Sequence, residues 1–239
     1  MAKESPQERA ARLAAERAKQ RAAERRRNIL MVAAVVLVMI GIIGGGFVIS
    51  RLTSSTPKDS AAAASVGSVT IGSDSAPHKV VIYEDFLCPY CGELEKQTHE
   101  ELATLADQGK VQVEYRPFNL LQTDYSQHTL EVFQVLAHNS TPEVAKKFHD
   151  ALYADQPSES ASSFPSVDDI TATAVAAGAD EADIKAALES SAPKWADAAT
   201  QAAEDAGVQS TPTILLDGTE FVGGSDIDSE AKALLDAVS

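Results

Sequence analysis

Two cysteines, Cys88 and Cys91, are the residues whose type and spacing point most directly to chemistry. Cysteines at positions i and i+3 in the first turn of a helix lie close enough to form a short-range disulfide. A helix N-terminus carries about half a positive charge and free N–H groups, which stabilise a thiolate. A lowered pKa would make Cys88 a nucleophile and a good leaving group, whereas Cys91, one turn further in, would resolve a mixed disulfide. The spacing therefore predicts thiol–disulfide exchange.

Two other interpretations of the cysteine pair are weaker. Half of a zinc site would need two further ligands, and no two of the five histidines have the spacing of a zinc finger. A purely structural disulfide could persist outside the cytoplasm, but a bond from i to i+3 closes a very small loop and removes little unfolded-state entropy. We therefore favour the redox role and predict no metal site.

The motif lies at a strand-to-helix junction. Residues 80–83 form a β-branched and aromatic run that is typical of a strand buried on both faces. Residues 93–105 have the apolar spacing of an amphipathic helix, and residues 111–118 are typical of another strand, so the three segments predict a βαβ unit. Glu84 and Asp85, just before the motif, either exchange protons with the thiols or face water at the strand end.

The run Phe86–Cys91 after a buried strand, together with residues 207–213 far downstream, resembles the DsbA-like thiol–disulfide oxidoreductases. More narrowly, it resembles their membrane-tethered members from Gram-positive bacteria. The resemblance covers about residues 66–239. It implies the α/β thioredoxin fold, interrupted by a helical insertion at about residues 119–206.

The resemblance also implies site residues. The cis-proline of the family corresponds to Pro212, which would face the disulfide. Thr211 would expose backbone polar groups that pair with an extended substrate strand. With Pro89 and Tyr90, these two residues make up the expected substrate-binding site. The best-known periplasmic oxidases have histidine where this chain has Tyr90, so the redox potential is not transferred with the resemblance.

The elements around Pro212 follow from local patterns. Thr213–Leu216 is typical of a strand, Asp217-Gly218 is a two-residue hairpin signal into a further strand, and residues 228–238 have the spacing of a final amphipathic helix. Helical spacing also recurs within residues 130–152 and at residues 184–188, which fits the insertion. Three large aromatic side chains of the insertion are expected in the core: Phe133, Phe148 and Trp195.

Charge divides the chain into parts that face different environments. The protein has 239 residues and a formal net charge of −15, which argues against a nucleic-acid binder. Residues 1–28 contain nine basic and four acidic side chains, whereas residues 52–239 contain ten basic and 31 acidic ones. Between them, residues 29–49 carry no charge over a length that spans about 30 Å as a helix, the thickness of a bilayer core.

This uncharged run is predicted to be a transmembrane helix. It is longer than the apolar stretch of about 7–15 residues in a cleaved signal peptide. A buried core helix is also disfavoured, because soluble helices rarely stay apolar on all faces over such a length. Three arginines abut its N-terminal end, so the positive-inside rule places residues 1–28 in the cytoplasm. Residues 50–65, rich in Ser, Ala and Thr, are expected to link the membrane to an extracytoplasmic domain.

The favoured function is therefore oxidation of cysteine pairs in exported proteins by a membrane-anchored enzyme. The resemblance implies that a quinone-linked membrane protein, DsbB-like or vitamin K epoxide reductase-like, reoxidises it; no cofactor is expected. Two alternatives stay open. One is a reductase or isomerase of the same fold, and the other is a non-catalytic domain that binds exported proteins.

Overall fold

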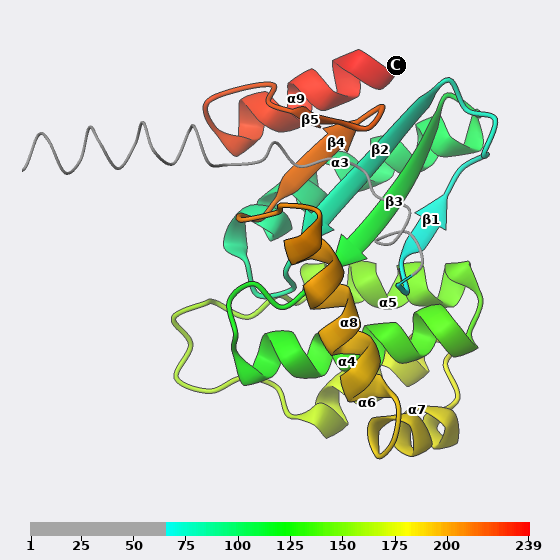
Figure 1. Ribbon diagram of the computed structural model, residues 1–239, viewed down its shortest axis with the longest axis vertical. Helices are drawn as coiled ribbons and strands as arrows, with labels where there is room; N and C mark the ends of the chain where they lie inside the picture. The colour runs from blue at the N-terminus through cyan, green and yellow to red at the C-terminus, as the bar shows by residue number, and fades with distance from the viewer. Residues whose placement is uncertain (1–65) are drawn as a thin grey trace, which may run out of the picture. The chain divides into compact units, whose positions relative to one another are not determined.

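The computed structural model describes residues 66–239 (Figure 1). The predicted cytoplasmic tail (1–28), transmembrane helix (29–49) and linker (50–65) lie outside these residues. Within residues 66–239, none of the helices combines the length and the apolar character needed to cross a bilayer.

The described part of the chain contains one five-stranded sheet and seven helices. In chain order, the elements are β1 (Val69–Ile71), β2 (His78–Glu84), α3 (Pro89–Asp107), β3 (Val111–Pro117), α4 (Asp124–Asn139), α5 (Pro142–Ala154), α6 (Val167–Ala177), α7 (Glu181–Leu188), α8 (Ala192–Asp205), β4 (Thr213–Leu216), β5 (Thr219–Phe221) and α9 (Ile227–Val238). The strand order is β1-β3-β2-β4-β5; β2 and β3 are parallel, and the other neighbours are antiparallel. The predicted βαβ unit is β2-α3-β3.

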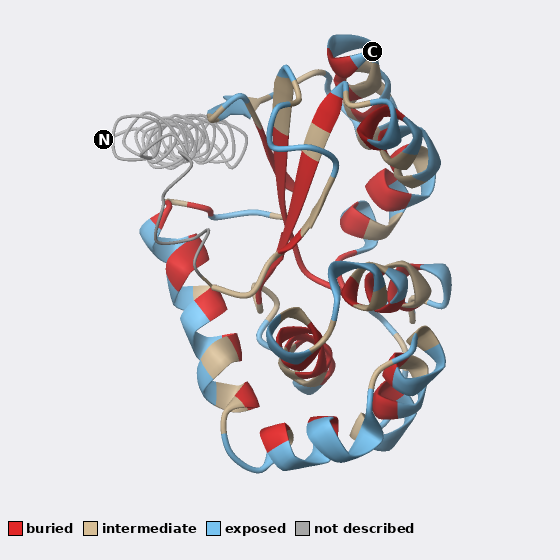
Figure 2. Ribbon diagram, turned by 90° about the vertical axis from the view of Figure 1, so that its right-hand side faces the viewer, coloured by how far each residue is buried: buried red, intermediate tan, exposed pale blue. Residues whose placement is uncertain are grey.

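Burial on both faces of β2 explains its uninterrupted apolar run. Val80 and Ile82 belong to the main core, with residues of α3 and α9, whereas Val81 and Tyr83 join a second cluster with residues from the end of α8. Alternate side chains of a strand point to opposite faces, so each face of the sheet has its own apolar layer. Figure 2 shows buried residues along the central strands and on the helix faces turned toward them.

The elements expected on either side of the insertion are confirmed. The strand expected at residues 111–118 ends at Pro117, and the final helix begins at Ile227 after Asp226, whose carboxylate forms a capping box with Ser229. At the hairpin, Asp217 and Gly218 both have positive φ angles, the conformation that a tight turn of this kind requires.

Helices α4 to α8 lie between β3 and β4, at the place where the helical insertion was expected (Figure 1). Phe133 and Phe148 are fully buried in the core, as expected. Trp195 is only half-buried and packs its ring 4.2 Å from that of His138. Periodicity did not reveal α8 because its buried face consists of alanines, which carry little apolar signal.

Removing the Phe133 ring tests how much the packing of the insertion against the rest of the core contributes to the free energy of unfolding. Its ring lies 5.7 Å from that of Phe86, which immediately precedes the redox motif. We expect Phe133→Ala to lower the free energy of unfolding by about 3–5 kcal/mol, as measured by urea denaturation. Val175→Ala, at a partly exposed position of α6, should change it by less than about 0.5 kcal/mol. Equal effects of the two variants would contradict this packing.

Candidate active site

The Cys-Pro-Tyr-Cys motif forms the N-terminus of α3. Cys88 is the N-cap, with φ −66° and ψ 118°, and its carbonyl oxygen accepts hydrogen bonds from the N–H groups of Cys91 and Gly92 at 3.1 and 3.2 Å. Pro89 occupies the first turn, where the N–H that proline lacks has no intrahelical partner. Both cysteines are free thiols in this structure, and Cys88 keeps 5% of its surface exposed against 2% for Cys91.

The two thiols differ strongly in acidity. A hydrogen bond from the Cys91 thiol is the main cause that lowers the pKa of Cys88 to about 6; burial opposes it, and the Thr211 side chain and the N–H groups of Tyr90 and Cys91 assist it. Burial raises the pKa of Cys91 well above its usual value, and the negative charges of Cys88 and Glu84 raise it further. At neutral pH the pair therefore holds one thiolate, on Cys88, and one thiol, on Cys91.

Residues more than a hundred positions downstream complete the site. The antiparallel pairing of β2 with β4 places Tyr83 opposite Thr213 and so brings the residues before β4 to the motif. The Thr211–Pro212 peptide bond is cis, as the resemblance implied. Sγ of Cys88 lies 3.4 Å from the carbonyl oxygen of Thr211, to which Cys88 donates a hydrogen bond when it is protonated.

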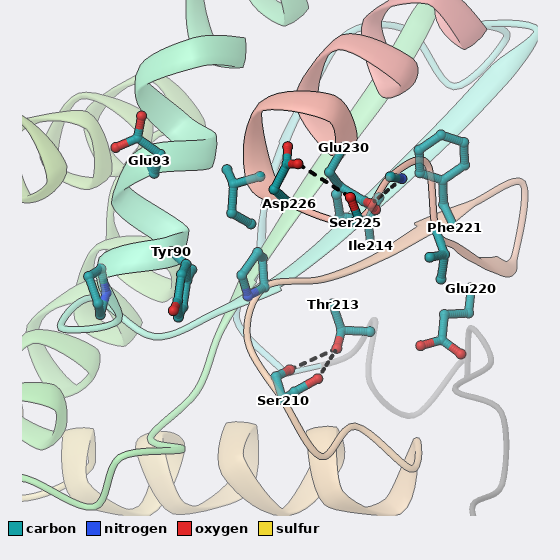
Figure 3. A pocket seen from close by; sticks show the side chains of 15 residues that line it. Tyr90, Glu93, Ser210, Thr213, Ile214, Glu220, Phe221, Ser225, Asp226 and Glu230 are labelled. Atoms are coloured by element: carbon teal, nitrogen blue, oxygen red, sulfur yellow. Dashed lines mark hydrogen bonds between the residues drawn. The ribbon is translucent and has the colours of Figure 1, made fainter. Parts of the chain in front are cut away.

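A groove of about 760 Å³ opens beside the cysteines (Figure 3). Tyr90 and Glu93 line it from α3, and the chain around Pro212, strand β5 and the start of α9 complete its walls. Apolar surface is available on its rim, where Tyr90 is 63% and Val222 76% exposed. Three of the four residues expected to bind substrate line this groove, namely Pro89, Tyr90 and Pro212; Thr211 meets the site through Cys88 instead.

Acidic side chains also line the groove. Glu230 accepts hydrogen bonds from the N–H groups of Gly223 and Gly224, at 2.9 and 3.1 Å, and Asp226 caps α9 (Figure 3). These two carboxylates therefore shape the wall. Glu93 and Glu220 also line the groove, so its walls carry acidic side chains on several sides.

Asp85 holds the loop between β2 and the motif. It is fully buried, and its carboxylate accepts hydrogen bonds from the N–H groups of Leu87 (2.9 Å) and Leu121 (3.0 Å) and from the hydroxyl of Ser126 (2.7 Å). These donors come from the motif loop and from the start of the insertion. Asp85 is thus a structural anchor, and the alternative that it faces water is wrong.

The insertion also fixes the backbone of the motif from the other side. The side-chain amide of Gln156 donates to the carbonyl oxygens of Phe86 at 3.0 Å and Cys88 at 2.9 Å. The Tyr153 hydroxyl donates to the carbonyl oxygen of Asp85 at 3.3 Å. The orientation of the redox helix therefore depends on residues at and beyond the end of α5.

Glu84 belongs to a buried group of charges, so it does not face water either. Its carboxylate lies 2.7 Å from Nε2 of His149, which has no exposed surface. Burial alone would lower the pKa of His149, but the carboxylates of Glu84 and Glu95 outweigh it and raise that pKa to about 9. Lys146 pairs with Glu95 at 3.2 Å and with Asp150.

The buried group has its own cations. Glu95, His149 and Asp150 place possible ligand atoms within 4.8 Å of one another. The Lys146 ammonium already pairs with the Glu95 and Asp150 carboxylates, however, and Nε2 of His149 is paired with Glu84. We therefore assign no metal site to these residues.

The sequence contains one signal for this buried group of charges, and it lies outside the cysteine motif. His149 lies between Phe148 and Leu152 on the buried face of α5, where a polar residue must find partners. Gln156 gave no such signal because its role depends on the path of a loop.

The family model described as thioredoxin matches residues 64–237. The chain belongs to the thioredoxin family. Its α/β fold with inserted helices is the thioredoxin arrangement predicted from the motif. No curated protein sequence matches this thioredoxin-family chain.

Solved structures resemble this thioredoxin-family protein over most of its described part. Oxidised DsbA from Mycobacterium tuberculosis is 25% identical, with a TM-score of 0.57 over 72% of this chain and 100% of that one. MdbA from Actinomyces oris, a thiol–disulfide oxidoreductase, is 22% identical, with a TM-score of 0.58 over 72% and 85%. BdbD from Bacillus subtilis is 18% identical, with a TM-score of 0.64 over 77% and 97%.

These matches confirm the predicted resemblance to DsbA-like proteins. The two structures below 25% identity support the fold alone. The family, the cysteine motif and the match to DsbA agree in making this protein a disulfide oxidoreductase.

The acidity of Cys88 can be tested by replacing its hydrogen-bond donor. We expect Cys91→Ala to raise the pKa of Cys88 above about 6, because the largest stabilising contact of the thiolate is lost. Cys91→Ser is the matched control, since its hydroxyl can still donate, and it should keep a lower pKa than Cys91→Ala. The measurement is the rate of alkylation by iodoacetamide as a function of pH. The same midpoint in both variants would contradict this cause.

Proposed function

We propose that this protein is an extracytoplasmic oxidase that donates its Cys88–Cys91 disulfide to exported proteins. The observation that carries the proposal is the contrast between the two thiols, with a pKa of about 6 for Cys88 and a strongly raised one for Cys91. Stabilising the Cys88 thiolate stabilises the reduced pair and so makes its disulfide a better oxidant.

The exchange proceeds in two displacements. A client thiolate attacks Sγ of Cys88, a client–Cys88 bond forms, and the Cys88–Cys91 bond breaks. Cys91 leaves as a thiolate and takes up a proton, because its pKa is high. A second client thiolate then attacks the client sulfur of the mixed disulfide, and Cys88 leaves as a stable thiolate. The client loses two electrons to the cysteine pair and two protons, of which Cys91 keeps one.

The groove beside Cys88 is the proposed binding site for the client. It begins at Pro89 and Tyr90 and runs past Pro212 to β5, so an extended segment lying in it passes the reactive sulfur. Partly exposed apolar side chains such as Val222 provide contacts for its side chains. A non-catalytic binding domain would not need the acidic thiol at the head of this groove.

The membrane location is proposed from the sequence. The uncharged run 29–49 follows a basic segment, and the acidic domain carries its cysteines on the opposite side of that run. Disulfides persist outside the cytoplasm, which suits an oxidase. Family resemblance supports a quinone-linked membrane protein, DsbB-like or vitamin K epoxide reductase-like, as the partner that reoxidises it.

The redox potential tests the direction of exchange. We expect the full chain, equilibrated with glutathione, to have a potential between about −270 mV and about −120 mV, because the pKa of Cys88 lies between those of the strongest oxidant and the thioredoxin reductant. The protein should also oxidise a reduced model client, and Cys88→Ser should not. A membrane-impermeant thiol reagent should label Cys88 in intact cells.

Three results would count against this function. A potential below that of thioredoxin without client oxidation would indicate a reductase, and efficient refolding of scrambled ribonuclease would indicate an isomerase. A biological effect that survives Cys88→Ser would indicate a binding domain.

Client binding in the groove can be separated from chemistry. We expect Val222→Asp to raise KM for a reduced peptide client by about tenfold and to leave kcat nearly unchanged, because it replaces an apolar contact in the groove and leaves both cysteines in place. Val175→Asp introduces the same change on α6, outside the groove, and should leave both constants as they are. Identical kinetics for the two variants would exclude the groove as the client site.

A further inference from the structure

The charged side chains of the groove beside Cys88 are all of one sign. Its described lining residues include no lysine, arginine or histidine, but they include four carboxylates: Glu93, Glu220, Asp226 and Glu230. A second groove, of about 740 Å³ between α3 and α5, is lined by Lys96 and His99 as well as by carboxylates. The two grooves that border the motif therefore differ in the charge that they present to a ligand.

Two of the four carboxylates are free to meet a ligand. Glu230 is engaged with backbone N–H groups, and Asp226 caps α9. Glu93 and Glu220 are exposed, and within residues 66–239 neither forms an ion pair with a basic side chain. The carboxylate of Glu93 accepts only a hydrogen bond of 3.3 Å, from the side-chain amide of Gln97.

The two free carboxylates lie on different walls of the groove. Tyr90 and Glu93 are three positions apart on α3, so their side chains are neighbours on the helix surface. A lysine or arginine placed there would meet both a carboxylate and the face of an exposed aromatic ring, to which cations are attracted. Glu220 belongs to the edge strand β5, on the other side of Pro212 from Tyr90 and Glu93 (Figure 3).

We propose that this groove prefers client segments with basic residues near their cysteines, and that Glu93 and Glu220 are the residues that set the preference. The inference rests on the proposed function, because the groove is the site at which that function places the client. Apolar contacts with side chains such as Val222 bind any extended segment, whereas the two carboxylates distinguish one segment from another by its charge.

A second source of attraction has to be separated from this one. Residues 52–239 contain 31 acidic and ten basic side chains, so the whole domain attracts basic peptides over a long range. Exposed ion pairs act over a short range, and each contributes little by itself. A preference set by the groove must therefore disappear when its own two carboxylates are neutralised and persist when two others are.

The test compares reduced peptides that each contain two cysteines and differ only in the residues beside the cysteines, which are lysine, glutamine or glutamate. The oxidised full chain in neutral detergent oxidises each peptide, and kcat/KM is measured by acid quenching and chromatography. Each value is divided by the rate of the same peptide with a small uncharged disulfide, because neighbouring charges change the thiolate fraction of the peptide itself.

We expect the lysine peptide to exceed the glutamine peptide by about tenfold in this normalised kcat/KM at low salt, and the glutamate peptide to fall below both. The advantage of lysine should shrink by at least about threefold in high salt, because exposed charges are screened. Glu93→Gln combined with Glu220→Gln should reduce the advantage to less than about threefold.

The matched control is Glu101→Gln combined with Glu204→Gln. It also removes two exposed carboxylates, one on α3 and one on α8, and neither lines the groove. This variant should keep the full advantage of lysine. Melting temperatures verify that both double variants are folded, and the single variants Glu93→Gln and Glu220→Gln replace the first one if it is not.

Three results would overturn the inference: equal rates for the lysine and glutamine peptides, an advantage that survives in the folded groove variant, or an equal loss in the control, which indicates net charge alone. In each of these cases the peptides are still oxidised, so the proposed function stands. If the native protein oxidises none of the peptides, the proposed function itself fails, and this is seen before any ratio is formed.

Discussion

The hydrogen bond from the Cys91 thiol to the Cys88 sulfur is the interaction on which the chemistry depends. Because of it, two side chains of the same type become a thiolate, on Cys88, and a thiol, on Cys91. The hydrogen bond forms because Cys88 lies at the start of α3, whereas Cys91 lies one turn further along the helix and is buried in the core. Strand β2 and helix α3 hold the two sulfur atoms in these different environments. An exposed pair with the same spacing would lack the burial that keeps Cys91 protonated.

The inserted helices contribute to the site as well as covering the sheet. Gln156 and Tyr153 bind the backbone of the motif, while His149 balances the charge of Glu84 below it. A thioredoxin domain could form its sheet and pack the apolar face of α3 on the core without these contacts, but the backbone of the motif would then lack the hydrogen bonds from Tyr153 and Gln156. The insertion thus supplies both the backbone clamp of the motif and the polar interior behind Cys91.

Local patterns in the sequence were sufficient for the strands, the redox helix and the position of the insertion. The apolar run of β2 and the cysteine spacing depend on near neighbours, so they can be recognised without knowing the fold. The cis form of Pro212 came from resemblance, since propensity favours trans. The contacts of Glu84 with His149 and of Gln156 with Cys88 join segments about 65 to 68 positions apart, and no local pattern encodes such pairings.

Gly92 follows the second cysteine and lies against the Gln156 side chain. A Cβ atom at position 92 would come within 2.2 Å of Oε1 of Gln156, whose amide is held by two carbonyl groups. Any larger residue there would displace the glutamine. Positions 92 and 156 are therefore expected to covary among homologues, with glutamine retained where glycine is retained, so that an alignment could trace how the inserted helices became coupled to the redox centre during evolution.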